Sequence, residues 1–243
     1  MTKIYTDAIE PVSGTTLTIG ESGQNTVLPG NDLRANVVQD LGGNAIFTSN
    51  GSGVLSGLNA AFGSPIVLIE SQTCSGESSV EFTTGITTAY KALMFSFLSM
   101  RTSDDSYSHL QFQVSDDGGS SYGKLATTGF WRDYTNSAGN SYGPGQDNTV
   151  TQYNSTNFIS LAEGMGGDTN EAAFGDVLIF NASGTTYTKG FSAAVGMLNS
   201  GSTSIKHGYT GGWLDTTDDI DAVKWQYSSG NLAGGTIKLY GFK

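Results

Sequence analysis

The sequence predicts an all-β protein, with a small irregular N-terminal β segment followed by an antiparallel β-sandwich or jelly roll. Composition is the first observation behind this prediction. Gly, Ser and Thr number 34, 29 and 28 of the 243 residues, whereas the helix-favouring residues Lys, Glu and Arg are scarce. The second observation is that apolar runs are short, and several alternate with polar residues as a sheet with one buried face requires.

Residues 1–63 contain only short β-like pieces, which Gly, Asn, Ser or Pro interrupt every few residues. These pieces are Ile4–Ile9, Thr15–Ile19, Thr26–Leu28, Leu33–Gln39 and Ala45–Thr48. None is long enough to build its own sheet, and isolated hairpins are marginally stable in water. Packing against other copies of the chain or against a larger assembly would stabilise them. We therefore expect residues 1–63 to be an attachment or stem segment, with a flexible arm as the alternative.

From residue 64 onward the apolar runs become longer, which indicates a β-sandwich head domain over residues 64–243. Some runs are apolar throughout, as in strands buried on both faces, and others alternate with polar residues. The expected strands are Pro65–Ile69, Ala92–Leu98, Leu110–Val114, Val177–Phe180, Val223–Tyr227 and Ile237–Leu239. Short strands separated by polar turns, with no amphipathic helix between them, are typical of a sandwich or jelly roll.

The segment Asp133–Asn157 is the candidate recognition region. It consists mainly of Asn, Ser, Gly, Thr and Gln, and we expect a long loop at one end of the sandwich. Aromatic rings with amide and hydroxyl neighbours suit recognition surfaces, including the faces of sugars. The candidate recognition residues are therefore Trp131, Tyr134, Tyr142 and Tyr153. Burial in the core or in a subunit interface is the alternative for these rings.

Paired aspartates at 104–105, at 116–117 and near 220 are candidate ligands for a hard cation such as Ca²⁺. The first two pairs lie between expected strands, and Gly118 and Gly119 follow the second pair, so hairpin turns explain them more simply. Solvated turn residues also explain Asp218, Asp219 and Asp221. We expect no metal and no cofactor, with calcium at these last three aspartates as the alternative.

Charge and motif content exclude several functions. Eleven basic and 22 acidic residues give a net charge of −11, so we expect neither nucleic acid nor an anionic membrane as a partner. No apolar run approaches the roughly 20 residues of a membrane-spanning helix, so we expect no membrane insertion. The sequence also has no Gly-x-Ser-x-Gly elbow, phosphate-binding loop or His-Glu-x-x-His helix. Since His109 and His207 lie in no recognisable nucleophile setting, we expect a protein that is not an enzyme.

The two ends of the chain resemble phage proteins. The opening, IYTDAIEPVSGTTLTIGESGQNTVLPG, resembles the starts of virion structural and tail-fibre proteins of tailed bacteriophages. The close, YSSGNLAGGTIKLYGFK, resembles the final strand of a broad group of phage structural proteins with C-terminal β-domains, through residues 229–231 and 235–241. The internal stretch QVSDDGGSSYGK also resembles the central hairpin of that group.

This resemblance implies a virion protein that forms a homotrimeric appendage, with an N-terminal attachment part and a C-terminal jelly-roll head. The length fits a short fibre, and the resemblance carries over no catalytic residue. The implied partners are other copies of the chain, other virion proteins and a glycan or protein of the host cell surface. A capsid decoration (cement) protein is one alternative, and a carbohydrate-binding module or polysaccharide-cleaving enzyme is another.

Overall fold

The computed structural model describes residues 37–39, 45–49, 52, 55–58, 65–201 and 203–243. Every regular element in these residues is a β-strand, which confirms the predicted all-β class. The chain divides into two compact units, Met1–Gly63 and Ser64–Lys243. The described residues include no helix that is long and apolar enough to cross a membrane. The roles expected for the two units, attachment and head, stay predictions.

The described residues of the first unit form a small antiparallel sheet. Its strands are β1 (Val37–Gln39), β2 (Ala45–Ser49) and β3 (Leu55–Leu58), in the order β1-β2-β3. Two of the expected pieces therefore contain strands, whereas β3 was not predicted. The expected pieces at 4–9, 15–19 and 26–28 lie outside the described residues.

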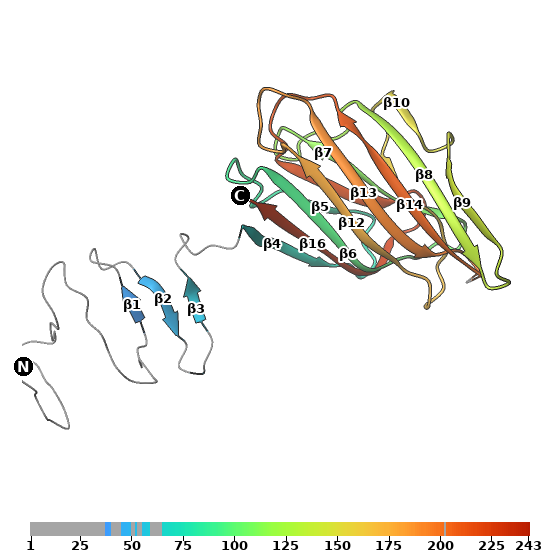
Figure 1. Ribbon diagram of the computed structural model, residues 1–243, viewed down its shortest axis with the longest axis horizontal. Helices are drawn as coiled ribbons and strands as arrows, with labels where there is room; N and C mark the ends of the chain where they lie inside the picture. Colours follow the sequence, from blue (N-terminus) through green and yellow to red (C-terminus); the bar gives the residue numbers. More distant parts are fainter. Residues whose placement is uncertain (1–36, 40–44, 50–51, 53–54, 59–64, 202) are drawn as a thin grey trace, which may run out of the picture. The chain divides into compact units, whose positions relative to one another are not determined.

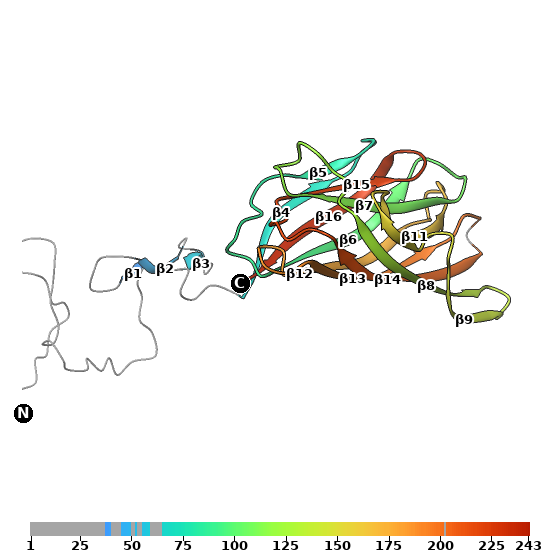
Figure 2. The ribbon, with the colours of Figure 1, turned by 90° about the horizontal axis from the view of Figure 1, so that it is seen from above.

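The second unit is a β-sandwich of two unequal antiparallel sheets, as Figures 1 and 2 show. The large sheet has the order β10-β8-β14-β13-β12-β6-β16-β4, and β9 shares the outer edge of β8 with β10. Its strands are β4 (Ile66–Thr73), β6 (Ala92–Thr102), β8 (Ala126–Asn136), β9 (Ser141–Gln146), β10 (Gln152–Ser155), β12 (Ala173–Phe180), β13 (Lys189–Leu198), β14 (Ser204–Leu214) and β16 (Leu232–Phe242).

The small sheet has the order β11-β7-β15-β5 and covers one face of the large sheet (Figure 2). Its strands are β5 (Val80–Phe82), β7 (Ser108–Ser115), β11 (Ile159–Met165) and β15 (Ala222–Tyr227). The alternation that predicted β7 is confirmed, because Leu110, Phe112 and Val114 are buried and the glutamines between them are not. One face of β7 therefore points into the core.

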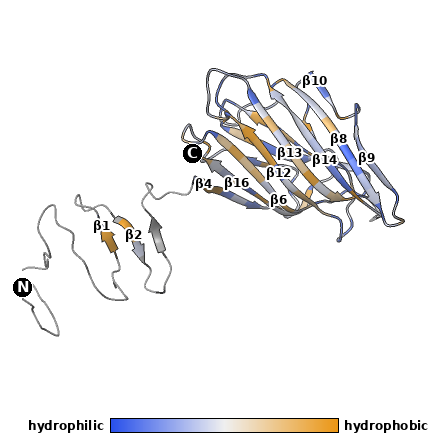
Figure 3. Ribbon diagram, in the orientation of Figure 1, coloured by the Kyte–Doolittle hydropathy of each residue, from blue (hydrophilic) through white to orange (hydrophobic). Residues whose placement is uncertain are grey.

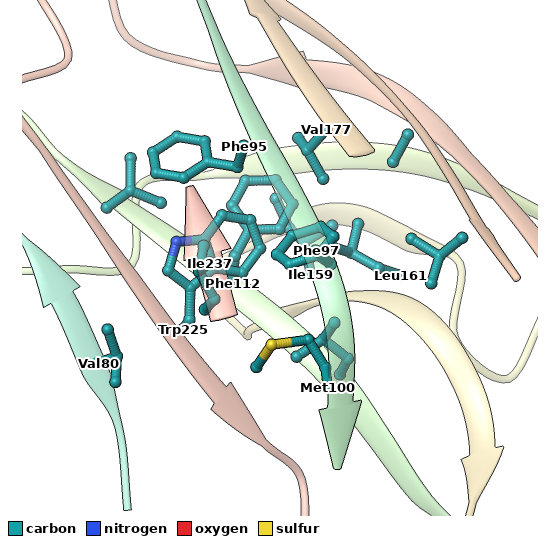
Figure 4. Packing of buried hydrophobic residues seen from close by; sticks show 14 of the residues in the cluster. Val80, Phe95, Phe97, Met100, Phe112, Ile159, Leu161, Val177, Trp225 and Ile237 are labelled. Carbon is teal, nitrogen blue, oxygen red and sulfur yellow. The ribbon is translucent and has the colours of Figure 1, made fainter. Parts of the chain in front are cut away.

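Aromatic rings join the two sheets in the core (Figure 4). Trp225 of β15 lies at the centre of this cluster and is fully buried. Its ring centroid is 5.0 Å from that of Phe95 and 4.8 Å from that of Phe97, both on β6 of the opposite sheet. Phe112 stacks on the same tryptophan at 5.2 Å. Such tilted and offset contacts are the geometry that aromatic pairs prefer, so they add to the hydrophobic stabilisation of the sandwich.

Candidate functional site

The four candidate recognition residues lie on strands, not on a long loop, so the loop predicted over Asp133–Asn157 is wrong. Trp131 and Tyr134 belong to β8, Tyr142 to β9 and Tyr153 to β10. Figure 1 shows β9 at the end of the large sheet, where it continues the edge beyond β8. Every residue of β9 is exposed, which is why its sequence carries no apolar alternation.

A tight turn joins β8 to β9. The Asn136 side-chain oxygen accepts hydrogen bonds from the backbone N–H groups of Ala138 and Asn140, at 3.1 and 2.9 Å. Gly139 has φ +79°, a left-handed conformation that glycine adopts without strain. Side-chain capping by Asn and a left-handed Gly are both standard turn chemistry. The polar residues of this region therefore build a hairpin.

A network of charged groups fills the space beneath the hairpin. The Arg132 guanidinium, on β8, lies 2.9 Å from a carboxylate oxygen of Glu163 and 3.1 Å from one of Asp147. The Tyr107 hydroxyl donates to Glu163 at 3.0 Å and accepts from the Lys206 ammonium, also at 3.0 Å. Two cations and two carboxylates thus balance one another in a mostly buried site.

Burial and hydrogen bonding shift the pKa values of Glu163 and Asp147 in opposite directions. Burial raises the pKa of Glu163, although the hydrogen bond from Tyr107 and the charge of Arg132 oppose this shift. Burial also acts to raise the pKa of Asp147, but the hydrogen bonds from Thr149 and the charge of Arg132 outweigh it and leave this pKa below its ordinary value. The arrangement favours a fixed ion-pair network that closes this end of the sandwich.

Tyr134 and Tyr142 come together at a small pocket between β8 and β9. Their rings stack with centroids 4.5 Å apart and planes inclined by 24°. The pocket, which we call the β8–β9 pocket, has a volume of about 320 Å³ and is also lined by Arg132, Gln146 and Asp147. Because the two rings cover one face of each other, only their outer faces remain for a ligand.

Tyr153 lies at a different and larger pocket, which we call the β7–β10 pocket. Its volume is about 560 Å³, and it lies between β7 and the segment 149–158 that includes β10. His109 and Gln111 of β7 contribute to it, together with Ser160 of β11. The structure therefore separates Tyr153 from the pair Tyr134 and Tyr142.

Trp131 faces neither pocket, because it lies on the outer face of the large sheet. It is 43% exposed, and its ring packs over the backbone of Gly129, where an added Cβ would come within 2.6 Å of ring carbons. An aromatic ring that covers a strand glycine stabilises the strand at that position. The four candidates thus occupy three separate surfaces.

The outer face of the large sheet also carries an apolar band, built from two neighbouring cross-strand rows. Strand register places these residues side by side from β4 to β14. The first row is Ile66, Phe242, Ala92, Phe180, Gly190 and Trp213, and the second is Leu68, Tyr240, Met94, Leu178, Ser192 and Gly211. Figure 3 shows hydrophobic residues along β6 and β12, whereas β9 is largely hydrophilic.

The band is uncharged and partly open to solvent. Its most exposed members are Ile66, Leu68, Phe180 and Trp213, at 41%, 51%, 45% and 52%. Single exposed apolar residues are normal on protein surfaces, whereas a contiguous apolar patch marks an interaction site. Sequence reasoning did not identify the band, because membership of it depends on register between strands far apart in the chain.

The acidic turn around residue 220 faces a buried lysine. Lys189 is fully buried, and its ammonium donates hydrogen bonds to the backbone carbonyls of Gly184, Tyr187 at 3.2 Å and Thr217 at 3.1 Å. Burial lowers the pKa of Lys189, while the nearby Asp219 and Asp218 act to raise it.

This lysine supplies positive charge beside the aspartates that were the alternative calcium ligands. Asp221 is tied down separately, since its carboxylate accepts a hydrogen bond from the backbone N–H of Gly118 at 2.8 Å. Among the described residues, no group of three or more His, Cys, Asp or Glu side chains is placed to hold a metal ion. The structure therefore does not gather Asp218, Asp219 and Asp221 into a calcium site.

Sequence reasoning missed the charged residues of these two clusters, but for three of them the alternation of buried positions along the strand contains a signal. Lys189 lies two residues before the buried Phe191, and Arg132 two residues after the buried Phe130. Lys206 shares the inward phase of Thr210 on β14. Glu163 has no such signal, because all of β11 is buried and its run has no alternation.

Comparison with protein-family models, with curated proteins and with solved structures gives no match for this chain.

Proposed function

We propose that the chain is a non-enzymatic structural subunit of a bacteriophage particle. In this proposal it forms a homotrimeric short fibre or similar appendage, attaches to other virion proteins and contributes to recognition of the host surface. The apolar band carries the proposal, because it is an uncharged surface on a chain whose net charge is −11. The resemblance of both chain ends to phage structural proteins supports the virion location.

A second copy of the chain is the occupant that we propose for the apolar band. The four most exposed side chains of the band are each about half exposed, so together they leave on the order of a few hundred Å² of apolar surface, the size of patches that mark interaction sites. A standard protein interface covers about 800 Å² per partner. The band can therefore form the apolar centre of one subunit contact, with polar residues around it, and closed symmetry would bring copies of it together around one axis.

The short strands of the first unit support an attachment role. They span three to five residues each, and strands this short gain stability mainly from neighbours. Repetition of the head in a trimer would also turn weak single contacts with a host surface into useful avidity.

Location on the particle tests the proposal. We would identify the chain in purified particles of the phage that encodes it by mass spectrometry, and then place it in a cryo-EM reconstruction. The expected result is threefold density at the tail or neck. Density on the head lattice would favour the capsid decoration alternative, and absence of the chain from particles would contradict a virion role.

A further inference from the structure

The β7–β10 pocket has an uncharged polar lining. Its side chains include the imidazole of His109, the amides of Gln111 and Asn157, and the hydroxyl of Ser155. No Lys, Arg, Asp or Glu of the described residues lines it. Its volume of about 560 Å³ lies within the range of small-molecule sites. The lining of this pocket therefore favours neither an anionic nor a cationic ligand through charge.

Side-chain hydrogen bonds fix the walls of this pocket. Gln111 donates to the Ser160 hydroxyl at 3.1 Å, which joins the two strands of the floor. Gln113 donates to the Thr156 carbonyl at 2.7 Å, and Gln152 donates to the Phe158 carbonyl at 2.5 Å. These bonds hold the segment 149–158 against the small sheet. A ligand would therefore enter a largely pre-formed site, which lowers the ordering cost of binding.

The histidine at the floor of the pocket is a neutral group at pH 7. Burial lowers the pKa of His109, and the positive charge of the nearby Lys206 lowers it further. A neutral imidazole offers one hydrogen-bond donor and one acceptor. Side-chain amides and hydroxyls likewise offer both, so the lining matches ligand groups that both donate and accept.

Tyr153 supplies an aromatic face at the same pocket. It is 70% exposed, so most of its ring is uncovered by other parts of the chain. A flat ring beside amide and hydroxyl groups can cover the CH face of a sugar while the polar groups bind its hydroxyls.

We propose that the β7–β10 pocket binds a neutral saccharide unit of a glycan. Sugar hydroxyls both donate and accept hydrogen bonds, and so they satisfy the amides, hydroxyls and imidazole of the lining. A purely apolar ligand would leave these groups unpaired, and an anionic one would find no cation. Saccharide binding here does not depend on trimer formation, because the pocket lies within one subunit.

Saccharide titration of the full chain tests this site. The probes are glucose, galactose, N-acetylglucosamine and maltose, with glucuronic acid as the charged comparison, each followed by saturation-transfer NMR up to about 10 mM. At least one neutral sugar should bind, more tightly than glucuronic acid. Tyr153→Ala and His109→Ala should each weaken that binding roughly tenfold.

Two control variants distinguish binding at this pocket from binding elsewhere on the chain. Tyr187→Ala removes a 73% exposed tyrosine outside the pocket and should leave binding unchanged. Tyr142→Ala, at the β8–β9 pocket, should also leave it unchanged. The proposal is overturned if no neutral sugar binds, if only glucuronic acid binds, or if Tyr142→Ala abolishes binding while Tyr153→Ala does not. Melting temperatures measured in parallel identify any variant that fails to fold.

Discussion

Two cationic side chains of this sandwich, the buried Lys189 and the half-buried Arg132, are each held by several partners. Lys189 reaches three backbone carbonyls, and Arg132 lies between Glu163 and Asp147. Removing a charge from water is costly, and several hydrogen bonds to the same group are needed to offset that cost. Deleting one of these cations removes a hydrogen bond or an opposite charge from several partners at once, so single substitutions at these positions have large effects.

Lys189→Met tests this point. The substitution keeps the length of the side chain but leaves the carbonyls of Gly184, Tyr187 and Thr217 without their donor. We expect the free energy of unfolding to fall by about 2–4 kcal/mol, measured by urea denaturation. The exposed Lys91→Met is the matched control and should change stability by less than about 0.5 kcal/mol. Equal stability of the two variants would show that the hydrogen bonds from Lys189 to the three carbonyls do not stabilise the fold.

Asp117 makes the stability of the fold depend on pH, with stability lost as the pH falls. Hydrogen bonds from Ser121 and Ser115 lower its pKa from 3.8 to about 2. The folded protein therefore keeps Asp117 ionised where the unfolded chain takes up a proton. The resulting stabilisation is complete above about pH 4 and is lost as the pH falls towards 2.

We expect Asp117→Asn to flatten the decline of the melting temperature between about pH 4 and pH 2. Calorimetry at several pH values measures this slope for the wild type and the variant. Asp168→Asn, on an exposed turn after β11, is the control for loss of a charge alone. A wild-type slope in Asp117→Asn would mean that the turn hydrogen bonds do not act through this carboxylate.

At the scale of elements, the sequence identified the strands whose side chains alternate or are apolar throughout. The strands β7 and β15 were found from alternation, and the first part of β6 from its apolar run. The strand β9 was missed because all of it is exposed, and β3 because it has only four residues. Strands that bury nothing or are very short leave little pattern to find. Burial on both faces was wrongly expected for the apolar runs in β4, β6 and β12, because the outer faces of these strands form the partly exposed apolar band.

The candidate site was less predictable than the strands. The four candidate aromatic residues are all at least partly exposed, and their role in recognition stays a prediction; their division among three surfaces depends on which strands pair. Trp131 and Tyr134 are three residues apart on β8 and therefore point to opposite faces. The apolar band shows the same dependence, because its rows join residues from 66 to 242.

Glycine at position 175 is required by the packing of the central strands. Its φ is +149°, and an added Cβ would lie 2.1 Å from the carbonyl oxygen of Ala194 on β13. We expect Gly175→Ala to destabilise the fold by about 2–4 kcal/mol in urea denaturation. Gly143→Ala on β9 is the matched control, since a Cβ there meets nothing within 4 Å, and it should be nearly neutral. Similar stabilities for the two variants would rule out steric crowding at Gly175.

At the scale of the second unit, one face of the large sheet is covered by the small sheet, and no other strand of that unit covers the opposite face. The uncovered face is polar in part, for example where His207 pairs with Asp133 at 2.8 Å. The apolar band lies apart from that pair and contains no charge. A surface of this kind is expected to associate, and a second copy of the chain is always present to occupy it.

A charge placed in the apolar band should therefore separate the subunits. We expect Phe180→Glu to lower the molar mass in solution while the circular dichroism spectrum remains that of the wild type. Phe174→Glu is the matched control, because Phe174 lies on the same face of the same strand, is 54% exposed and lies outside the band. It should keep the wild-type mass. Loss of association in Phe174→Glu alone would place the contact elsewhere on the sheet.

The molar mass of the full chain, measured by sedimentation equilibrium at micromolar concentration, tests self-association most directly. We expect three times the chain mass of 25.4 kDa. A single species of 25.4 kDa that persists as the protein concentration rises would contradict it.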